Sequence, residues 1–144
     1  MKNRTFSEYV TPISNDFKFS AITNLLVAKV IGGMKPSKSS GLDKISARLL
    51  KDISDVIVPF LTEFFNLSLT QGIFPNDWKQ ARVSPMFKSG DKEDCSNYRP
   101  ISVLSVVSKL FEKLVYEQLN TYLTHNNVFT HYQSGFRRGH STRI

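Results

Sequence analysis

Two cationic side chains flank a short polar loop in the middle of the sequence. Lys88 ends a strand-like run, residues 81–88, and Arg99 lies near the start of a second run, residues 98–103. The loop between them contains Ser89, Gly90 and Asp91, so the segment is predicted to form a β-hairpin with a long, charged tip. Two cations held across a hairpin can grip a polyphosphate, because arginine offers a planar fork and lysine a point charge. A surface hairpin with merely solvated charges is the alternative.

A second group of basic residues lies near the carboxyl end. Residues 125–144 contain no acidic residue, while Arg137, Arg138 and Arg143 are interspersed with Phe136 and three histidines. Guanidinium groups beside aromatic rings suit contacts to a nucleic-acid backbone combined with stacking on bases. A frayed cationic terminus is the alternative interpretation.

The sequence does not match three common motifs of catalytic or metal sites. Only three residues separate Gly135 from Gly139, and His140 stands where a P-loop needs lysine, which argues against nucleotide hydrolysis. No serine lies in the G-x-S-x-G frame of a hydrolase nucleophile. The three histidines lack neighbouring carboxylates or thiols at metal-ligand spacing, so we interpret them as surface residues.

The acidic residues do not form a recognisable metal site. A two-metal catalytic site needs carboxylates that hold two metal ions about 4 Å apart. The aspartates lie in expected helix flanks and loops, without an Asp-Asp pair on a hairpin. Asp91, Glu93 and Asp94 come closest, but their loop position beside Lys92 favours a solvated tip. We therefore predict no catalytic residue and no metal ligand in this chain.

Helices are expected on both sides of the hairpin. Ser20 is a candidate N-cap for a helix ending near Met34. Residues 46–71 form a second helical region, which Gly72 is expected to stop and Pro59 to kink or divide. Apolar residues cover so much of its circumference that we expect a buried hub.

A long helix is expected after the hairpin. Ser105 is its candidate cap, and apolar residues recur after it with a 3.6-residue period. Trp78, just before the hairpin, is expected to pack between helix and strand; stacking on a base is the alternative.

Length and composition limit the functional classes. At 144 residues the chain is domain-sized, and a compact domain near this length buries roughly 70% of its extended surface. The net charge of +7 favours a polyanionic partner, nucleic acid before membrane. Cys95 is the only cysteine, which excludes an internal disulfide. No apolar run approaches the roughly 20 residues of a membrane span. We expect an intracellular protein of the nucleus, the cytoplasm or both, without a membrane partner.

Four phrases of the sequence resemble, in the family's order, the reverse transcriptases of non-LTR (LINE-like, jockey-like) retrotransposons. KSSGLDKISARLLK at 38–51 resembles the motif that opens the domain. FPNDWKQARVSPMFKSGD at 74–91 and NYRPISVLSVVSKLFEKL at 97–114 resemble its fingers motifs. QSGFRRGHST at 133–142 resembles the template-contacting segment. The ordered set is more specific than any one phrase.

The resemblance implies an α/β (mixed α+β) fold: the fingers and part of the palm of a right-hand polymerase, with helices packed around a β-hairpin. It implies that Lys88 and Arg99 contact the triphosphate of an incoming nucleotide, and that the template strand is contacted by Arg137, Arg138, Ser141 and Thr142. The implied partners are an RNA template, a DNA primer, deoxynucleotide triphosphates, and the palm and thumb that follow in the family. The family's metal-binding aspartates also follow later, so Mg²⁺ is expected for the intact polymerase and no cofactor for this chain.

We expect a polar leader over residues 1–19 and an incomplete reverse transcriptase domain over residues 20–144. The domain would comprise a helical part (20–72), a fingers hairpin (73–103), and a long helix with a basic tail (104–144). The expected function is that of an RNA-directed DNA polymerase fragment that contributes nucleotide and template binding, lacks the catalytic aspartates and is inactive alone. The alternatives are a non-enzymatic nucleic-acid-binding or assembly module and a decayed retroelement remnant.

Overall fold

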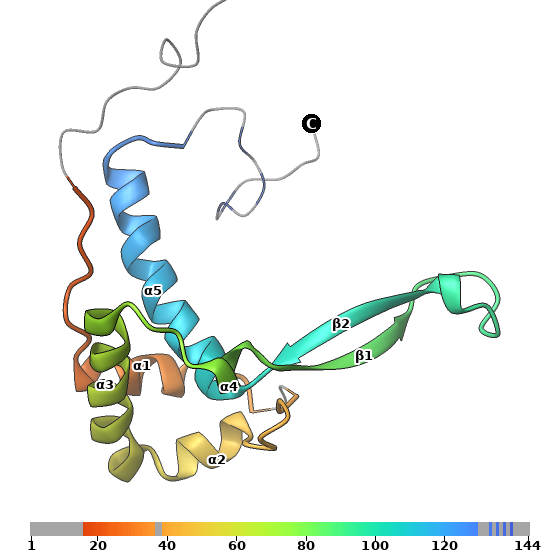
Figure 1. Cartoon of the computed structure of the whole chain (residues 1–144), viewed down its shortest axis with the longest axis horizontal. Coiled ribbons are helices and arrows are strands. Elements are labelled where there is room, and N and C mark those ends of the chain that lie inside the picture. Colours follow the sequence, from red (N-terminus) through yellow and green to blue (C-terminus); the bar gives the residue numbers. More distant parts are fainter. Residues whose placement is uncertain are drawn as a thin grey trace, which may run out of the picture. The chain divides into compact units, whose positions relative to one another are not determined.

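The structure, a computed structural model, describes residues 16–36 and 39–129, together with residues 133, 135, 137 and 139. In chain order, the elements are α1 (Asn24–Gly32), α2 (Ala47–Asp52), α3 (Ser54–Gln71), α4 (Asn76–Lys79), β1 (Ala81–Phe87), the 3-10 turn η2 (Cys95–Asn97), β2 (Tyr98–Leu104) and α5 (Val106–His125) (Figure 1). The predicted mixture of helix and strand is confirmed. Contacts divide the chain into two units, residues 21–115 and residues 1–20 with 116–144.

Helix α1 begins later than the sequence suggested. Its N-cap is Thr23, whose hydroxyl oxygen accepts a hydrogen bond from the amide of Leu26 at 3.3 Å. Ser20 is therefore not the cap. Instead, its amide donates to the Gln118 side-chain oxygen at 2.8 Å, and its carbonyl accepts from the Gln118 amide nitrogen at 3.0 Å. Both backbone groups of Ser20 are hydrogen-bonded to the Gln118 side chain, and Ser20 therefore lies in the extended segment before the helix.

The second helical region is divided, but not at its proline. Ser46 caps α2, and the chain leaves helical geometry at Ile53 before α3 begins. Pro59 lies inside α3, where it lacks the amide hydrogen that would bond to the Asp55 carbonyl. Gly72 ends α3 with a φ of 65°, which confirms the predicted stop.

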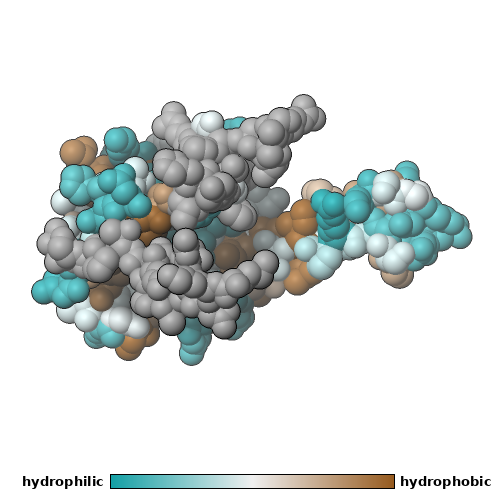
Figure 2. Space-filling view, turned by 90° about the horizontal axis from the view of Figure 1, so that it is seen from above, coloured by the Kyte–Doolittle hydropathy of each residue, from teal (hydrophilic) through white to brown (hydrophobic). Residues whose placement is uncertain are grey.

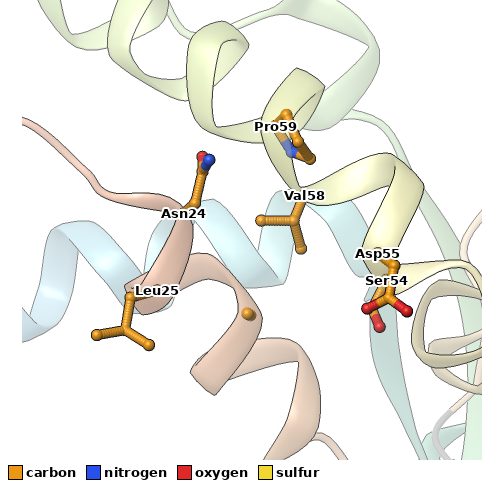
Figure 3. A pocket seen from close by; sticks show the side chains of 7 residues that line it. Asn24, Leu25, Ser54, Asp55, Val58 and Pro59 are labelled. Atoms are coloured by element: carbon orange, nitrogen blue, oxygen red, sulfur yellow. The ribbon is translucent and has the colours of Figure 1, made fainter.

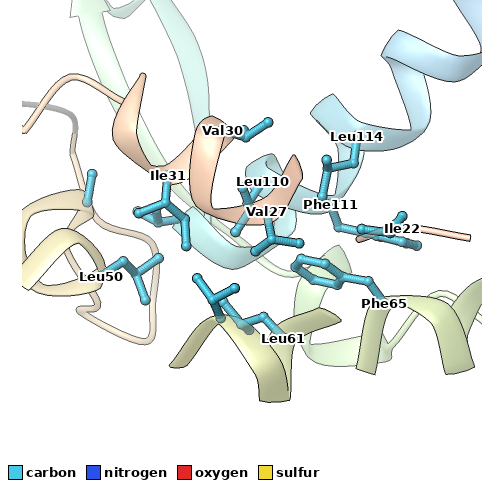
Figure 4. Packing of buried hydrophobic residues seen from close by; sticks show 13 residues of the cluster. Ile22, Val27, Val30, Ile31, Leu50, Leu61, Phe65, Leu110, Phe111 and Leu114 are labelled. Carbon is cyan, nitrogen blue, oxygen red and sulfur yellow. The ribbon is translucent and has the colours of Figure 1, made fainter. Parts of the chain in front are cut away.

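The core is built among helices of the first unit. Buried side chains from α1, α2, α3 and the first half of α5 meet in one cluster, which Figure 4 shows around Val27, Ile31, Phe65 and Leu110. Only one side of α3 reaches this cluster, so the expectation of a buried hub is wrong for its other side.

Trp78 is a packing residue, as predicted, but its ring partners lie on helices α3 and α5 and in the loop before α4. It lies on the short helix α4, and its ring centroid is 5.4–5.7 Å from those of four phenylalanines: Phe64, Phe65, Phe74 and Phe111. Its backbone carbonyl also accepts a hydrogen bond from the buried Ser108 hydroxyl at 3.2 Å. The cluster fixes the chain immediately before the hairpin to α3 and α5.

The hairpin has the predicted strands with ends shifted by one residue. Strands β1 and β2 pair antiparallel from Ala81 opposite Leu104 to Phe87 opposite Tyr98. Most strand residues are exposed, so the helices pack chiefly on one another rather than around the strands. The distal end of the hairpin is mostly hydrophilic in Figure 2.

The base of the hairpin is fixed by a close backbone contact. An ideal Cβ on Gly41 would lie 2.7 Å from both the nitrogen and the Cα of Ser105, so glycine is the residue that fits there. Ser105 joins β2 to α5, and its hydroxyl accepts a hydrogen bond from the Ser108 amide at 2.9 Å. This bond confirms the predicted Ser105 cap.

The second unit includes the end of α5 and the segment that precedes α1. Within it, the rings of Phe17 and Tyr122 lie 5.0 Å apart. Among the described residues, no helix is long and apolar enough to cross a membrane.

Candidate functional site

The candidate site is one face of the hairpin near its tip. The register pairs Met86 with Arg99, and the Lys88 amide extends the ladder by donating to the Asn97 carbonyl at 2.9 Å. Directly opposed residues of an antiparallel pair point to the same face, and alternate residues along a strand do so as well. Lys88 and Arg99 therefore share a face as diagonal neighbours.

This arrangement leaves both cations open to a ligand. Diagonal neighbours in an antiparallel pair lie about 7–8 Å apart, a spacing at which two long cationic side chains can reach one polyphosphate. Both residues are exposed. No described carboxylate forms an ion pair with either one. The face can thus bind an anion without first breaking an internal salt bridge.

The tip loop is tied together by its own polar groups. The Asn97 side-chain amide donates to the Asp91 carbonyl at 2.9 Å, and the Tyr98 hydroxyl donates to the Lys92 carbonyl at 2.9 Å. Gly90 has a φ of 95°, and an ideal Cβ there would lie 2.7 Å from the Asn97 side-chain nitrogen. These contacts restrict the loop that connects the two cationic positions.

Asp94 caps the turn η2 with its carboxylate. One oxygen accepts from the Ser96 amide and the other from the Ser96 hydroxyl, each at 2.8 Å. The amide bond, followed by the hydroxyl bond, lowers the pKa of Asp94 below its usual value because both bonds favour the charged form. Asp94 therefore serves as a turn cap.

The acidic residues of the described part of the chain do not gather into a metal site. No group of three or more histidine, cysteine, aspartate or glutamate side chains is placed to hold an ion there. Asp91 accepts the Glu93 amide at 3.0 Å and, like Asp94, stabilises the loop. Both carboxylates thus have structural roles in the tip loop.

The opposite face of the hairpin carries an aromatic pair that sequence reasoning did not single out. Phe87 and Tyr98 face each other across the strands with ring centroids 5.5 Å apart, and the Lys92 ammonium lies 5.8 Å from the Phe87 centroid. The alternation of the two runs could have indicated this pair. Cross-strand aromatic pairs stabilise hairpins, so the rings hold the register on which the cationic face depends.

The predicted template-contacting residues are described only in part. Arg137 is half-buried; its guanidinium carbon lies 5.2 Å from the Phe129 ring centroid, and it donates to the Gln133 carbonyl at 3.4 Å. Arg138, Ser141 and Thr142 lie outside the described residues. The structure thus places Lys88 and Arg99 on one face of the hairpin. Of the four predicted template-contacting residues it describes only Arg137, so that prediction is not tested.

Comparison with known proteins identifies long relatives. No family model matches the chain. The chain is 32% identical over 139 residues to a probable RNA-directed DNA polymerase from transposon BS of Drosophila melanogaster, which covers 96% of this chain and 15% of the relative. It is 31% identical, with the same two shares, to the RNA-directed DNA polymerase from mobile element jockey of that species. A probable RNA-directed DNA polymerase from transposon X-element is 33% identical over 81% of this chain and 13% of its own length.

The first two matches cover 96% of this chain, so they include the hairpin and the core helices. The chain spans about 15% of the first two relatives, so it corresponds to a limited stretch of much longer polypeptides. The chain is thus a fragment whose relatives are RNA-directed DNA polymerases of non-LTR retrotransposons.

Proposed function

We propose that this chain supplies the nucleotide-gripping hairpin of an RNA-directed DNA polymerase. In this proposal, Lys88 and Arg99 bind the triphosphate of an incoming deoxynucleotide from one face of the fingers. The carrying observation is the strand register, which puts both exposed cations at diagonal positions of the same face. Family membership supplies the substrate class.

The two cations would act in different ways. Arg99 projects from a paired strand and can donate two parallel hydrogen bonds to phosphate oxygens. Lys88 sits where the loop begins and supplies a point charge. Negative charge grows on the leaving pyrophosphate during transfer, so both residues would stabilise the transition state as well as the bound nucleotide. The described residues provide binding but no metal cage, so the metal-assisted step is not assigned to them.

We also propose that the basic end of the chain follows the template strand, with an RNA template and a DNA primer as partners of the intact polymerase. Arg137 supports the proposal through its position over the Phe129 ring, because a guanidinium held against a ring can still donate hydrogen bonds to a phosphate. The roles of Arg138, Ser141 and Thr142 rest on the family resemblance. By the same reasoning, Mg²⁺ is proposed as a cofactor of the intact polymerase, which would work inside the cell.

The test of the hairpin uses a full-length polymerase in which this chain replaces the matching stretch of the BS-element relative. Arg99→Lys keeps the charge and removes the planar fork. We expect it to cost about 1–3 kcal/mol, the scale of a charge-assisted hydrogen bond, or about fivefold to a hundredfold in kcat/KM for nucleotide. Lys88→Ala should also lower kcat/KM, while template affinity should stay nearly constant in both variants.

Lys92→Ala is the matched control, because it removes a cation of the same hairpin that lies over the Phe87 ring on the opposite face. Its kinetics should resemble those of the unsubstituted polymerase. If Arg99→Lys and Lys88→Ala show unchanged nucleotide kinetics with an unchanged melting profile, the charges of the hairpin are merely solvated and the proposal fails.

A further inference from the structure

A methionine adjoins both cations of the hairpin. The Lys88 amide bonds to the carbonyl of Asn97 directly opposite, so the pair of Met86 with Arg99, two residues along the ladder, is also of the hydrogen-bonded kind. Opposed residues of such a pair have Cα atoms about 5.5 Å apart, and residues two apart along one strand are separated by about 7 Å. Met86 therefore shares the face of Arg99 and Lys88 and lies next to each of them.

The side chain of Met86 is open to solvent. It is 58% exposed, whereas Met34, the other methionine in the described part of the chain, is partly buried and packed against the core. An oxidant must reach the sulfur of a thioether in order to react with it. Met86 is therefore the more readily oxidised of the two.

Oxidation changes what this side chain offers to Arg99. A thioether is apolar and a weak hydrogen-bond acceptor, so it does not compete with a phosphate for the guanidinium donors. A sulfoxide is polar, and its oxygen accepts hydrogen bonds. Because the methionine side chain has three rotatable bonds, that oxygen can reach the planar fork of Arg99 across the strands.

We propose that Met86 is a site of reversible oxidation by hydrogen peroxide, and that its sulfoxide weakens the binding of a triphosphate to the hairpin. A sulfur lone pair attacks one peroxide oxygen, and the O–O bond breaks as the S–O bond forms. The other oxygen keeps its own proton, takes the second one and leaves as water, so sulfur loses two electrons and peroxide gains them. A methionine sulfoxide reductase restores the thioether with a pair of thiols, which becomes a disulfide, and releases water. The inference rests on the proposed nucleotide binding by Lys88 and Arg99.

Peptide mapping by mass spectrometry tests the selectivity of the oxidation. The 144-residue chain with Cys95→Ser, which removes its exposed thiol, is treated with hydrogen peroxide for increasing times. We expect Met86 to gain oxygen severalfold faster than Met34, because its sulfur is the more accessible. Equal rates, or a faster reaction at Met34, would overturn the proposal.

The functional test uses the full-length polymerase in which this chain replaces the matching stretch of the BS-element relative. The unsubstituted protein and Met86→Leu are each compared with their own untreated samples, so oxidation at positions that the two proteins share cancels. We expect peroxide to lower kcat/KM for nucleotide about fivefold to tenfold more in the unsubstituted protein, the scale of one hydrogen bond. Methionine sulfoxide reductase should reverse this difference. Equal losses in the two proteins, or a loss that the reductase does not reverse, would contradict the proposal.

Met86→Leu with Leu25→Met is the matched control, because it keeps the number of methionines and moves one to another exposed position. Leu25 is 79% exposed and lines a groove between α1 and α3, whose described lining residues include no lysine or arginine (Figure 3). Oxidation should lower kcat/KM no more in this variant than in Met86→Leu alone. A loss as large as that of the unsubstituted protein would assign the effect to methionine oxidation in general and overturn the proposal.

Arg99→Lys separates this proposal from that of the nucleotide-binding hairpin. If Arg99→Lys lowers kcat/KM but oxidation of Met86 does not, the hairpin binds nucleotide and the oxidation proposal alone fails. If Arg99→Lys leaves the nucleotide kinetics unchanged, both proposals fail.

Discussion

Gly41 offers a direct test of how the helical core holds the base of the hairpin. In Gly41→Ala the new methyl group would lie 2.7 Å from the nitrogen and Cα of Ser105 and 2.9 Å from the carbonyl carbon of Leu104. These are backbone atoms, so the clash cannot be relieved by rotating a side chain. The junction between β2 and α5, or the loop that contains Gly41, has to move.

The loss of stability in Gly41→Ala can be estimated from known costs of overpacking. Inserting a methylene into a well-packed region costs about 1–3 kcal/mol. For a chain of about this length, each kcal/mol lost from the free energy of unfolding lowers the melting temperature by roughly 3–5 °C. We therefore expect Gly41→Ala to melt roughly 3–15 °C below the unsubstituted chain in a circular dichroism scan.

Gly32→Ala is the matched control, because it makes the same chemical change where no atom lies within 4 Å of the new methyl group. Gly32 is the last residue of α1, and alanine is the better helix former by about 0.8–1.0 kcal/mol in a helix interior. The control should keep or raise the melting temperature. If the two variants melt at the same temperature, the close contact between Gly41 and Ser105 does not contribute to stability and the reasoning is refuted.

Three further predictions concern catalysis, charge and pH. The 144-residue chain given primer-template, deoxynucleotides and magnesium or manganese should show no primer extension above a buffer control, because its described residues form no metal-holding cluster; measurable extension would contradict this. The chain should bind single-stranded RNA or DNA weakly, with a log–log salt slope of about −3 if about four phosphates are contacted, and Arg137→Ala with Arg138→Ala should flatten the slope by roughly one to two units; salt-independent binding would reject an electrostatic contact. Because the folded-state pKa of Asp94 is lowered, the cap of η2 should be intact above the usual carboxyl pKa and be lost as the pH falls through the lowered one. The NMR shift of the Ser96 amide should report this transition, and an identical acid titration in Asp94→Asn would assign it to another group.

Local signals predicted much of the fold, and long-range contacts explain the errors. Gly72 and Ser105 were predicted correctly because a left-handed stop and a side-chain cap involve only nearby residues. Ser20 was assigned wrongly because Gln118, 98 positions away, holds its backbone. Rules for predicting helix caps use only nearby residues, so they miss a long-range contact of this kind.

The two sides of α3 show a second limit of sequence reasoning. Periodicity identifies a helix whose apolar residues cover much of its circumference, but it does not tell which side the rest of the chain covers. Phe65 is fully buried, whereas Phe60, five residues earlier on the same helix, is 66% exposed. Both are phenylalanines, and only the tertiary packing of α1 and α5 against one side distinguishes them.

The candidate site depends on the pairing register of β1 and β2, which the sequence suggested but did not determine. A slip of one residue between β1 and β2 would keep both strands but move Arg99 to the face opposite Lys88. The observed register is held at the tip by the contact of Phe87 with Tyr98 and by the bond of Asn97 to the loop. Alternation along the two runs could have indicated the aromatic pair, whereas the bond of Asn97 to the Asp91 carbonyl is seen only in the structure. The pairing of the two cations therefore rests on neighbouring residues that need not touch a nucleotide at all.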